Sequence, residues 1–178
     1  MQKQWKIRES RKSDAQAIMS LLLVSWLDTY VNEDLGITRD FILEKRLPWL
    51  EYPFLRDECK FNNFINTKDN LHMVAEDENG VVVGFIHCTR DGDGQQINGL
   101  YIFKEFQGSG LAQEFAKKFD EWEDKNEDSW LGVVSYNKRA IKFYEKLGFK
   151  DNGVKYDIYE KIPCIDMVKL NKKENPDE

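Results

Sequence analysis

The clearest apolar stripe of the chain predicts an amphipathic helix over residues 111–122. Its members follow at spacings of four, four and three: Leu111, Phe115, Phe119 and Trp122. Just upstream, the aromatic-rich run Leu100 to Phe103 predicts a strand, and Gln107 to Gly110 supplies a flexible loop. Free amides at a helix start, and glycines that allow close approach to the backbone, favour a bound phosphate. This stretch therefore predicts a site for a phosphate-bearing cofactor.

Upstream of residue 70 the pattern is mainly helical. After a short strand over residues 5–8, Ser13 to Gln16 has the form of a capping box, which predicts a helix to about Tyr30. Its core-facing side is expected to carry Ala17, Ile18, Leu21, Leu22 and Ser25. From Thr38 to about Asn66 the pattern predicts two or three short helices, with interruptions at Pro48 and Pro53.

A β section follows. Strands are expected over residues 71–76, 81–89, 95–102 and 129–134, with turns at 78–80 and 91–94. Asn137 is a suitable N-cap for a short helix that ends at Gly148, and residues 156–159 and 163–170 predict a closing hairpin. The pattern alone supports one mixed α/β domain over residues 1–170, with one sheet between helices and a charged, flexible tail over 171–178.

Composition narrows the possible partners. The 178 residues carry a net charge of −6, so we expect no nucleic-acid partner, whereas a cationic substrate is easily accommodated. No apolar run of 18 residues and no signal-peptide core occur, which predicts a cytoplasmic protein without a membrane partner. Two histidines are too few for a metal cluster, and three scattered cysteines favour reduced, inert thiols, so no metal is expected.

The glycine loop narrows the cofactor. No Walker sequence occurs, and Gln113 stands where a dinucleotide fingerprint needs a third glycine. Gln107 to Ala112 instead spells Gln-x-x-Gly-x-Ala, which resembles the Arg/Gln-x-x-Gly-x-Gly/Ala signature of the GNAT superfamily of N-acetyltransferases. The run from Asn137 to Phe149 is similar to a second GNAT hallmark, Asn-x-x-Ala-x-x-Phe-Tyr-x-Lys-x-Gly-Phe, at every named position.

The resemblance implies a fold and a set of roles. In the GNAT fold a mixed, mostly antiparallel α/β sheet splays apart, and the co-substrate acetyl-CoA lies in the gap. By this resemblance Asn137 hydrogen-bonds the cofactor and Tyr144 is the general acid to the departing thiolate. Backbone groups that would hold the pantetheine arm are those of Leu100, Tyr101 and Ile102. Groups that would hold the pyrophosphate are those of Gln107, Gly108, Ser109, Gly110, Leu111 and Ala112.

The sequence offers alternatives for the general base that takes the proton from the amine and for the residues that orient this amine. Many GNAT members carry a glutamate on the strand before the glycine loop, but Gln95 to Gly99 contains none. Either water removes the proton from the amine, or another group such as His87 does. Asp28 and Tyr30 are candidates to orient the amine.

The acceptor can be narrowed only by analogy. The runs Ser25 to Tyr30 and Trp130 to Val133 look most like the bacterial spermidine/spermine N-acetyltransferases, which suggests a primary amine of a small molecule, such as a polyamine, as the acceptor. Alternatives are protein N-termini as substrates, or a non-catalytic acetyl-CoA-binding or regulatory module. Dimers are common in the family, so a homodimer is a further expectation.

Overall fold

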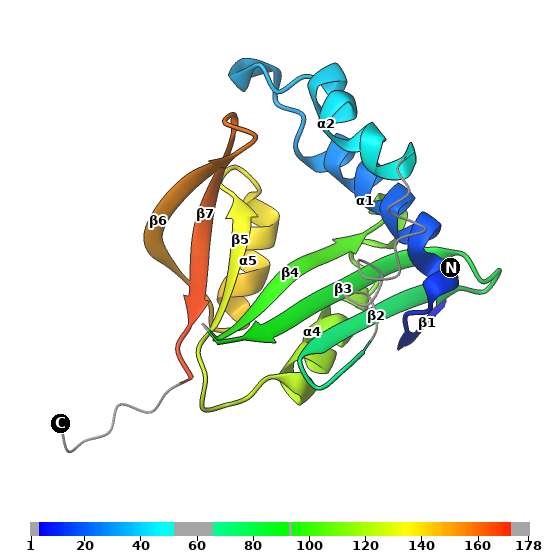
Figure 1. Ribbon diagram of the computed structural model, residues 1–178, viewed down its shortest axis with the longest axis vertical. Helices are drawn as coiled ribbons and strands as arrows, with labels where there is room; N and C mark the ends of the chain where they lie inside the picture. The colour runs from blue at the N-terminus through cyan, green and yellow to red at the C-terminus, as the bar shows by residue number, and fades with distance from the viewer. Residues whose placement is uncertain (1–3, 52–65, 93, 172–178) are drawn as a thin grey trace.

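The computed structural model describes residues 4–51, 66–92 and 94–171 (Figure 1). Within these ranges the strands are β1 (Trp5–Glu9), β2 (Asn70–Asp77), β3 (Val82–Asp91), β4 (Gly94–Ile102), β5 (Ser129–Val134), β6 (Lys150–Ile158) and β7 (Ile162–Lys169). The α-helices are α1 (Ala15–Thr29), α2 (Arg39–Glu51), α4 (Leu111–Trp122) and α5 (Lys138–Lys146). The strands form one seven-stranded sheet in the order β1-β2-β3-β4-β5-β7-β6.

One strand pair shapes the whole sheet. All neighbours are antiparallel except β4 and β5, which are parallel and are paired only at Gln95 with Ser129 and at Gln96 with Trp130. Beyond these pairs the two strands part, and Figure 1 shows β4 and β5 diverging from their common end. The expected mixed α/β, mostly antiparallel and splayed sheet is therefore confirmed.

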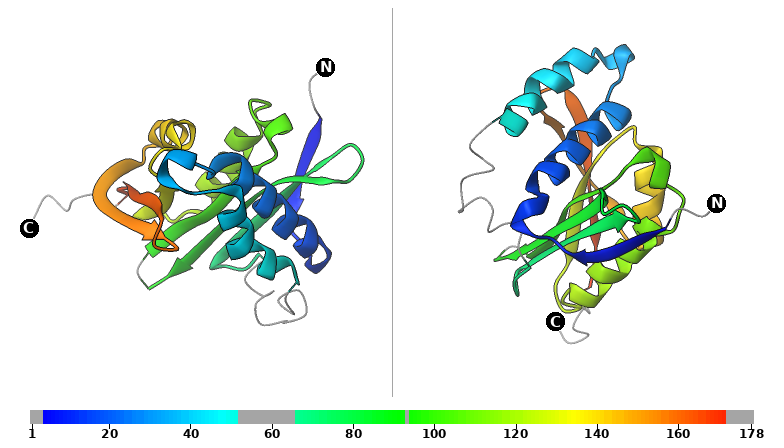
Figure 2. Two further views of the ribbon diagram at one scale, coloured as in Figure 1. Left: turned by 90° about the horizontal axis from the view of Figure 1, so that it is seen from above. Right: turned by 90° about the vertical axis from the view of Figure 1, so that its right-hand side faces the viewer.

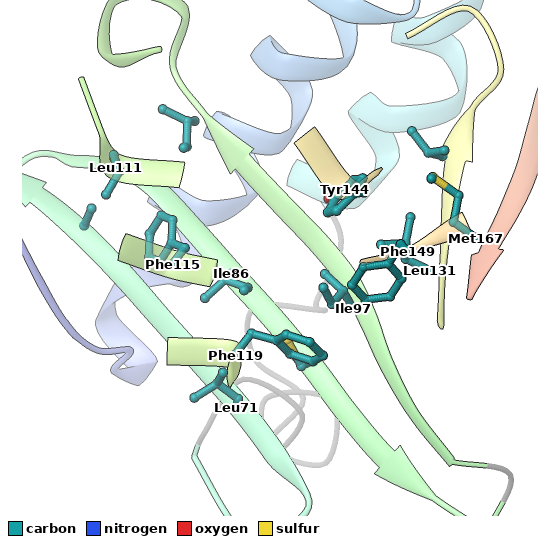
Figure 3. Close-up of a cluster of buried hydrophobic side chains, with 14 of the residues drawn as sticks. Leu71, Ile86, Ile97, Leu111, Phe115, Phe119, Leu131, Tyr144, Phe149 and Met167 are labelled. Atoms are coloured by element: carbon teal, nitrogen blue, oxygen red, sulfur yellow. The ribbon is translucent and has the colours of Figure 1, made fainter. Parts of the chain in front are cut away.

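Helices cover both faces of the sheet (Figure 2). Because side chains alternate along a strand, each strand supplies apolar residues to both faces. On one face α4 and α5 bury the main core, in which Phe115, Phe119, Tyr144 and Phe149 pack on Ile86, Ile97, Leu131 and Met167 (Figure 3). On the other face Ile18 and Leu21 of α1 pack on Val74, Val82 and Phe85. The domain therefore closes two apolar layers around one sheet.

Two local predictions about the N-terminal half were wrong. Ser13 to Gln16 does not form the capping box, because Asp14 instead accepts the Arg11 amide at 2.7 Å and the Arg8 guanidinium at 2.6 and 2.8 Å. Pro48 does not interrupt the helix, because it lies inside α2. Its missing N–H would have bonded to the carbonyl of Glu44, an exposed position near the end of the helix where water can replace the bond. Pro53 and the tail over 172–178 lie outside the described residues.

Candidate active site

A cavity opens where β4 and β5 part. Its volume is about 320 Å³, and its walls come from α1, β4, the glycine loop, β5 and α5. From residue 97 onward the edge of β4 toward β5 has no strand pairing, so its backbone groups are open to a ligand that runs alongside it as an extra strand would. Leu100, Tyr101 and Ile102, the three predicted pantetheine-holding residues, all line this cavity.

The glycine loop forms one end of the cavity. Gly108 and Gly110 have φ values of +81° and +91°, a conformation that L side chains rarely adopt, and Gly110 is the N-cap of α4. A Cβ at either position would meet no atom within 4 Å, so the backbone faces open space rather than packed side chains. Together with the first-turn amides of α4, this arrangement suits an anion such as a pyrophosphate.

Side chains around the loop hold it in place. Trp5 Nε1 donates to Ser109 Oγ at 3.1 Å, and Ser109 Oγ donates to the Phe106 carbonyl at 2.7 Å. Gln107 Nε2 donates to the Ile102 carbonyl at 3.0 Å, and its oxygen accepts from Arg139. The Ser109 and Gln107 side chains therefore hold the loop itself, and a ligand would bind mainly through backbone groups.

Some of the predicted loop residues line the cavity and others do not. Gln107, Gly108 and Ala112 line it, whereas Leu111 is fully buried against the core and can contribute only its backbone amide. Sequence reasoning missed Arg139, which also lines the cavity. Among the described residues of the lining it is the one charged side chain, and it suits a phosphate. The sequence could have indicated Arg139 by its position, because it is a basic residue two positions after the Asn137 cap, at the start of a predicted helix.

Asn137 and Tyr144 both line the cavity from α5. Asn137 caps this helix, because its side-chain oxygen accepts the Ala140 amide at 3.1 Å. A ligand contact would therefore use its side-chain NH2 group. Tyr144 is 8% exposed and packs edge-on against Phe149 and Phe143. Burial raises the pKa of its phenol, and Tyr101 and Cys88 add to the shift, so the hydroxyl keeps its proton at neutral pH.

A second group of aromatic residues closes the cavity on the α1 side. The Tyr101 hydroxyl accepts from Trp26 Nε1 at 3.2 Å and is 3.2 Å from the Tyr30 hydroxyl, while Tyr136 donates to the Tyr30 carbonyl at 2.6 Å. Burial raises the pKa of Tyr30, and the neighbouring Tyr101 adds to the effect. Tyr30 thus lines the cavity, with Ser25 and Thr29 beside it.

Two predicted site residues are placed elsewhere. Asp28 is exposed on α1, and neither it nor His87 belongs to the described lining of the cavity. His87 lies on β3 opposite His72, with ring centroids 5.1 Å apart, on the face toward α1. Burial, with a contribution from His87, lowers the pKa of His72 to about 3. The structure therefore does not bring His87 together with Tyr144 in the cavity.

On β4, the strand that lacks the expected glutamate, Gln95 has a structural role. The buried Gln95 side chain donates to the carbonyls of Asp124 and Glu127 at 2.7 and 3.0 Å and accepts the Asp124 amide at 2.8 Å. It fastens the loop between α4 and β5 just before the strands part. Asn98, further along β4, lines the cavity and accepts a hydrogen bond from Thr89 Oγ1 at 2.9 Å.

The described residues contain neither a cluster suited to a metal ion nor a helix suited to span a membrane. Residues 4–51, 66–92 and 94–171 contain no group of three or more His, Cys, Asp or Glu side chains placed to hold a metal ion. No helix in the described part of the chain has the length and apolar character to cross a membrane. Cys88 and Cys164 are buried free thiols, and Cys59 lies outside the described residues.

Much of the sequence matches a known protein family. Residues 37–149 match the Acetyltransferase (GNAT) family, a stretch that includes β4, the glycine loop and α5. The chain belongs to the GNAT family. An uncharacterized N-acetyltransferase from Mycobacterium bovis is 33% identical over 102 residues, which cover 54% of this chain and 64% of that protein. The chain thus matches somewhat less than two thirds of the length of that relative.

Solved structures of N-acetyltransferases share the fold. The PaiA N-acetyltransferase from Thermoplasma acidophilum, solved in complex with coenzyme A, superposes with a TM-score of 0.66 at 20% identity, over 93% of this chain and 98% of that one. Mutant forms of a spermidine/spermine N-acetyltransferase from Vibrio cholerae superpose with a TM-score of 0.59 at 17% identity, over 94% of each chain. At these identities the likeness concerns the fold.

Proposed function

We propose that this GNAT protein transfers an acetyl group from acetyl-CoA to a primary amine of a small molecule. The observation that carries the proposal is the cavity itself. The open edge of β4, the glycine loop and the Tyr144 phenol all meet in one space between β4 and β5. A polyamine is the acceptor class we favour, because the chain has a net charge of −6 and a polycation is attracted to an acidic protein.

The cofactor roles follow from the groups that face the cavity. Backbone groups of β4 at residues 100–102 would hold the pantetheine arm, since this stretch has no strand pairing toward β5 and only the Ile102 carbonyl is engaged, by Gln107 Nε2. Amides of the loop and of the first turn of α4 would hold the pyrophosphate, and Arg139 would add a positive charge beside them.

In the reaction the amine nitrogen attacks the thioester carbonyl carbon, and the C–S bond then breaks. The departing thiolate takes a proton, for which Tyr144 is the proposed donor. Its raised pKa keeps the phenol protonated at neutral pH. Burial in the same place also raises the proton affinity of the thiolate, which offsets the raised pKa of the phenol.

The amine must be neutral when it attacks. The described lining of the cavity holds no carboxylate and no histidine, so the proton would leave the ammonium through water. Ser25, Thr29 and the Tyr30 side of the cavity offer hydroxyl groups that can orient such a water or the amine itself.

The test is release of free thiol from acetyl-CoA against polyamines, aminoglycosides, amino acids and N-terminal peptides. Tyr144→Phe should lower kcat by about 10²-fold or more, as expected for loss of a general acid, with the dissociation constant of CoA unchanged. Tyr159→Phe is the matched control, because its hydroxyl contacts Arg46 at 3.4 Å outside the described lining.

Three outcomes separate the alternatives. Turnover on polyamines with the expected Tyr144→Phe loss supports the full proposal. Turnover only on N-terminal peptides replaces the small-molecule acceptor with a protein substrate. CoA binding without turnover on any amine favours a non-catalytic acetyl-CoA-binding module.

A further inference from the structure

A carboxylate lies beside the gap between β4 and β5, on the face opposite α5. Asp166 of β7 pairs in register with Gly132 of β5, and Gly132 lines the cavity. Side chains alternate along β5, so residue 132 points away from the face that buries Leu131 and Val133 beside Tyr144. Asp166 therefore belongs to the face toward α1, the face from which Ser25, Thr29 and Tyr30 reach the cavity. It borders the cavity at Gly132 without belonging to the described lining.

Gly132 leaves a space that other residues fill. The position of a Cβ on residue 132 coincides with the hydroxyl of Tyr156 from β6, and Asp166 Oδ1 is 3.8 Å from the same point. Tyr156 is separated from β5 by β7 in the sheet order, so its ring reaches across β7 toward the gap. Burial raises the pKa of Tyr156 to about 12, and interactions with Cys164 and then Asp166 add to the shift. A hydroxyl and a carboxylate thus converge on one backbone position of the cavity.

The carboxylate of Asp166 has the opposite charge to the one charged side chain of the described cavity lining. Arg139 is the one charged side chain in the described lining, and from α5 it contacts Gln107 of the glycine loop, where a phosphate would bind. Asp166 is half-buried beside the other wall of the gap. A carboxylate that is partly withdrawn from water and set next to a hydroxyl binds an alkylammonium group well, since both oxygens accept N–H donors.

We propose that Asp166, with Tyr156 over Gly132, binds an ammonium group of the acceptor and so selects cationic amines. This inference rests on the proposed acetyltransferase function and names the part of the cavity that receives the acceptor. Asp166 is a binding and specificity residue in this scheme. The glycine at 132 leaves room for the Tyr156 hydroxyl, which then stands beside Asp166 where the acceptor would approach.

The test compares three variants with spermidine as acceptor and acetyl-CoA at saturation. Asp166→Asn should raise KM for spermidine by about tenfold or more, because a charge-assisted hydrogen bond becomes a neutral one, with little change in kcat or in CoA affinity. Gly132→Ala should also raise KM without any change of charge, because its Cβ displaces the Tyr156 hydroxyl. Asp157→Asn, on the same hairpin but exposed, is the control and should leave KM unchanged.

The results separate this inference from the proposed function. A KM for Asp166→Asn within twofold of the Asp157→Asn control overturns the Asp166 site while leaving the acetyltransferase intact. If no amine is turned over, the proposed function fails. Calorimetry of spermidine binding to the CoA-loaded protein then tests the ammonium site at Asp166. Binding that is lost in Asp166→Asn but kept in Asp157→Asn supports the ammonium site, whereas equal binding in both variants, or none in the unmodified protein, overturns it.

Discussion

Replacement of Gln95 by alanine tests whether the base of the gap is held by side-chain hydrogen bonds. Gln95 is fully buried and belongs to the last residues at which β4 and β5 are paired. Three of its side-chain hydrogen bonds reach the Asp124 amide and carbonyl and the Glu127 carbonyl, at 2.7 to 3.0 Å, and a longer one accepts from Arg90 at 3.3 Å. Alanine removes the three short bonds and leaves the loop between α4 and β5 without its buried partner.

The magnitude follows from the number of bonds. Each buried hydrogen bond contributes about 1 kcal/mol net, so Gln95→Ala should lower the free energy of unfolding by about 3 kcal/mol. A domain of this size is stable by about 5–15 kcal/mol, so the variant should still fold. CoA binding should weaken as well, since the loop fixes the point from which the two strands part.

Urea unfolding followed by far-UV circular dichroism measures the effect, with Gln96→Ala as the control. Gln96 is the next residue of β4, is paired with Trp130 and is only half-buried, so its loss should cost less than about 1 kcal/mol. If the two variants differ by less than about 1 kcal/mol, the hydrogen bonds of Gln95 are not what holds the base of the gap.

Two further predictions concern a histidine and a glycine. The pKa of His72, lowered to about 3 by burial and by His87, lies below its unfolded value, so its contribution to stability is complete above about pH 6.5 and is lost as pH falls toward 3. NMR titration should show a neutral imidazole down to about pH 4, and a midpoint above 5 would contradict the burial argument. Gly110→Ala forces a side chain into φ +91° and should cost about 1 kcal/mol of stability while weakening CoA binding. Gly80→Ala, at φ +78° in the β2–β3 turn, should cost the same stability with CoA affinity unchanged, and equal CoA affinity in the two variants would speak against the loop as the pyrophosphate site.

The sequence was sufficient wherever neighbours along the chain decide the outcome. The spacing from Leu111 to Trp122 predicted the bounds of α4, and the apolar run from Ser129 to Val134 predicted those of β5. The Asn137 cap and the turn at Gly148 were also predicted. Periodicity, capping and glycine conformation depend on residues a few positions apart, so a pattern in the sequence records them directly. For the same reason the glycine loop was identified before its surroundings were known.

Other expectations failed because distant residues decided them. Arg8 from β1 engages Asp14, which removed the expected capping box, and α2 continues through Pro48 close to the end of the helix. The side of the sheet on which His87 lies followed from its pairing with His72. Local patterns do not encode which partner a side chain meets across the sheet.

The candidate acceptor site shows the same division most clearly. Nothing near Gly132 in the sequence marks it as close to Asp166 and Tyr156, which follow 34 and 24 residues later. They meet because β7 pairs with β5 in one register and β6 lies at the edge next to β7. The sequence alone determined α4, β5, the cap of α5 and the loop that suits a phosphate, whereas it missed the continuous α2 and the start of β6 at Lys150. Only the tertiary structure decided which side chains gather at the gap, because strand order and register are set by the burial of the whole sheet.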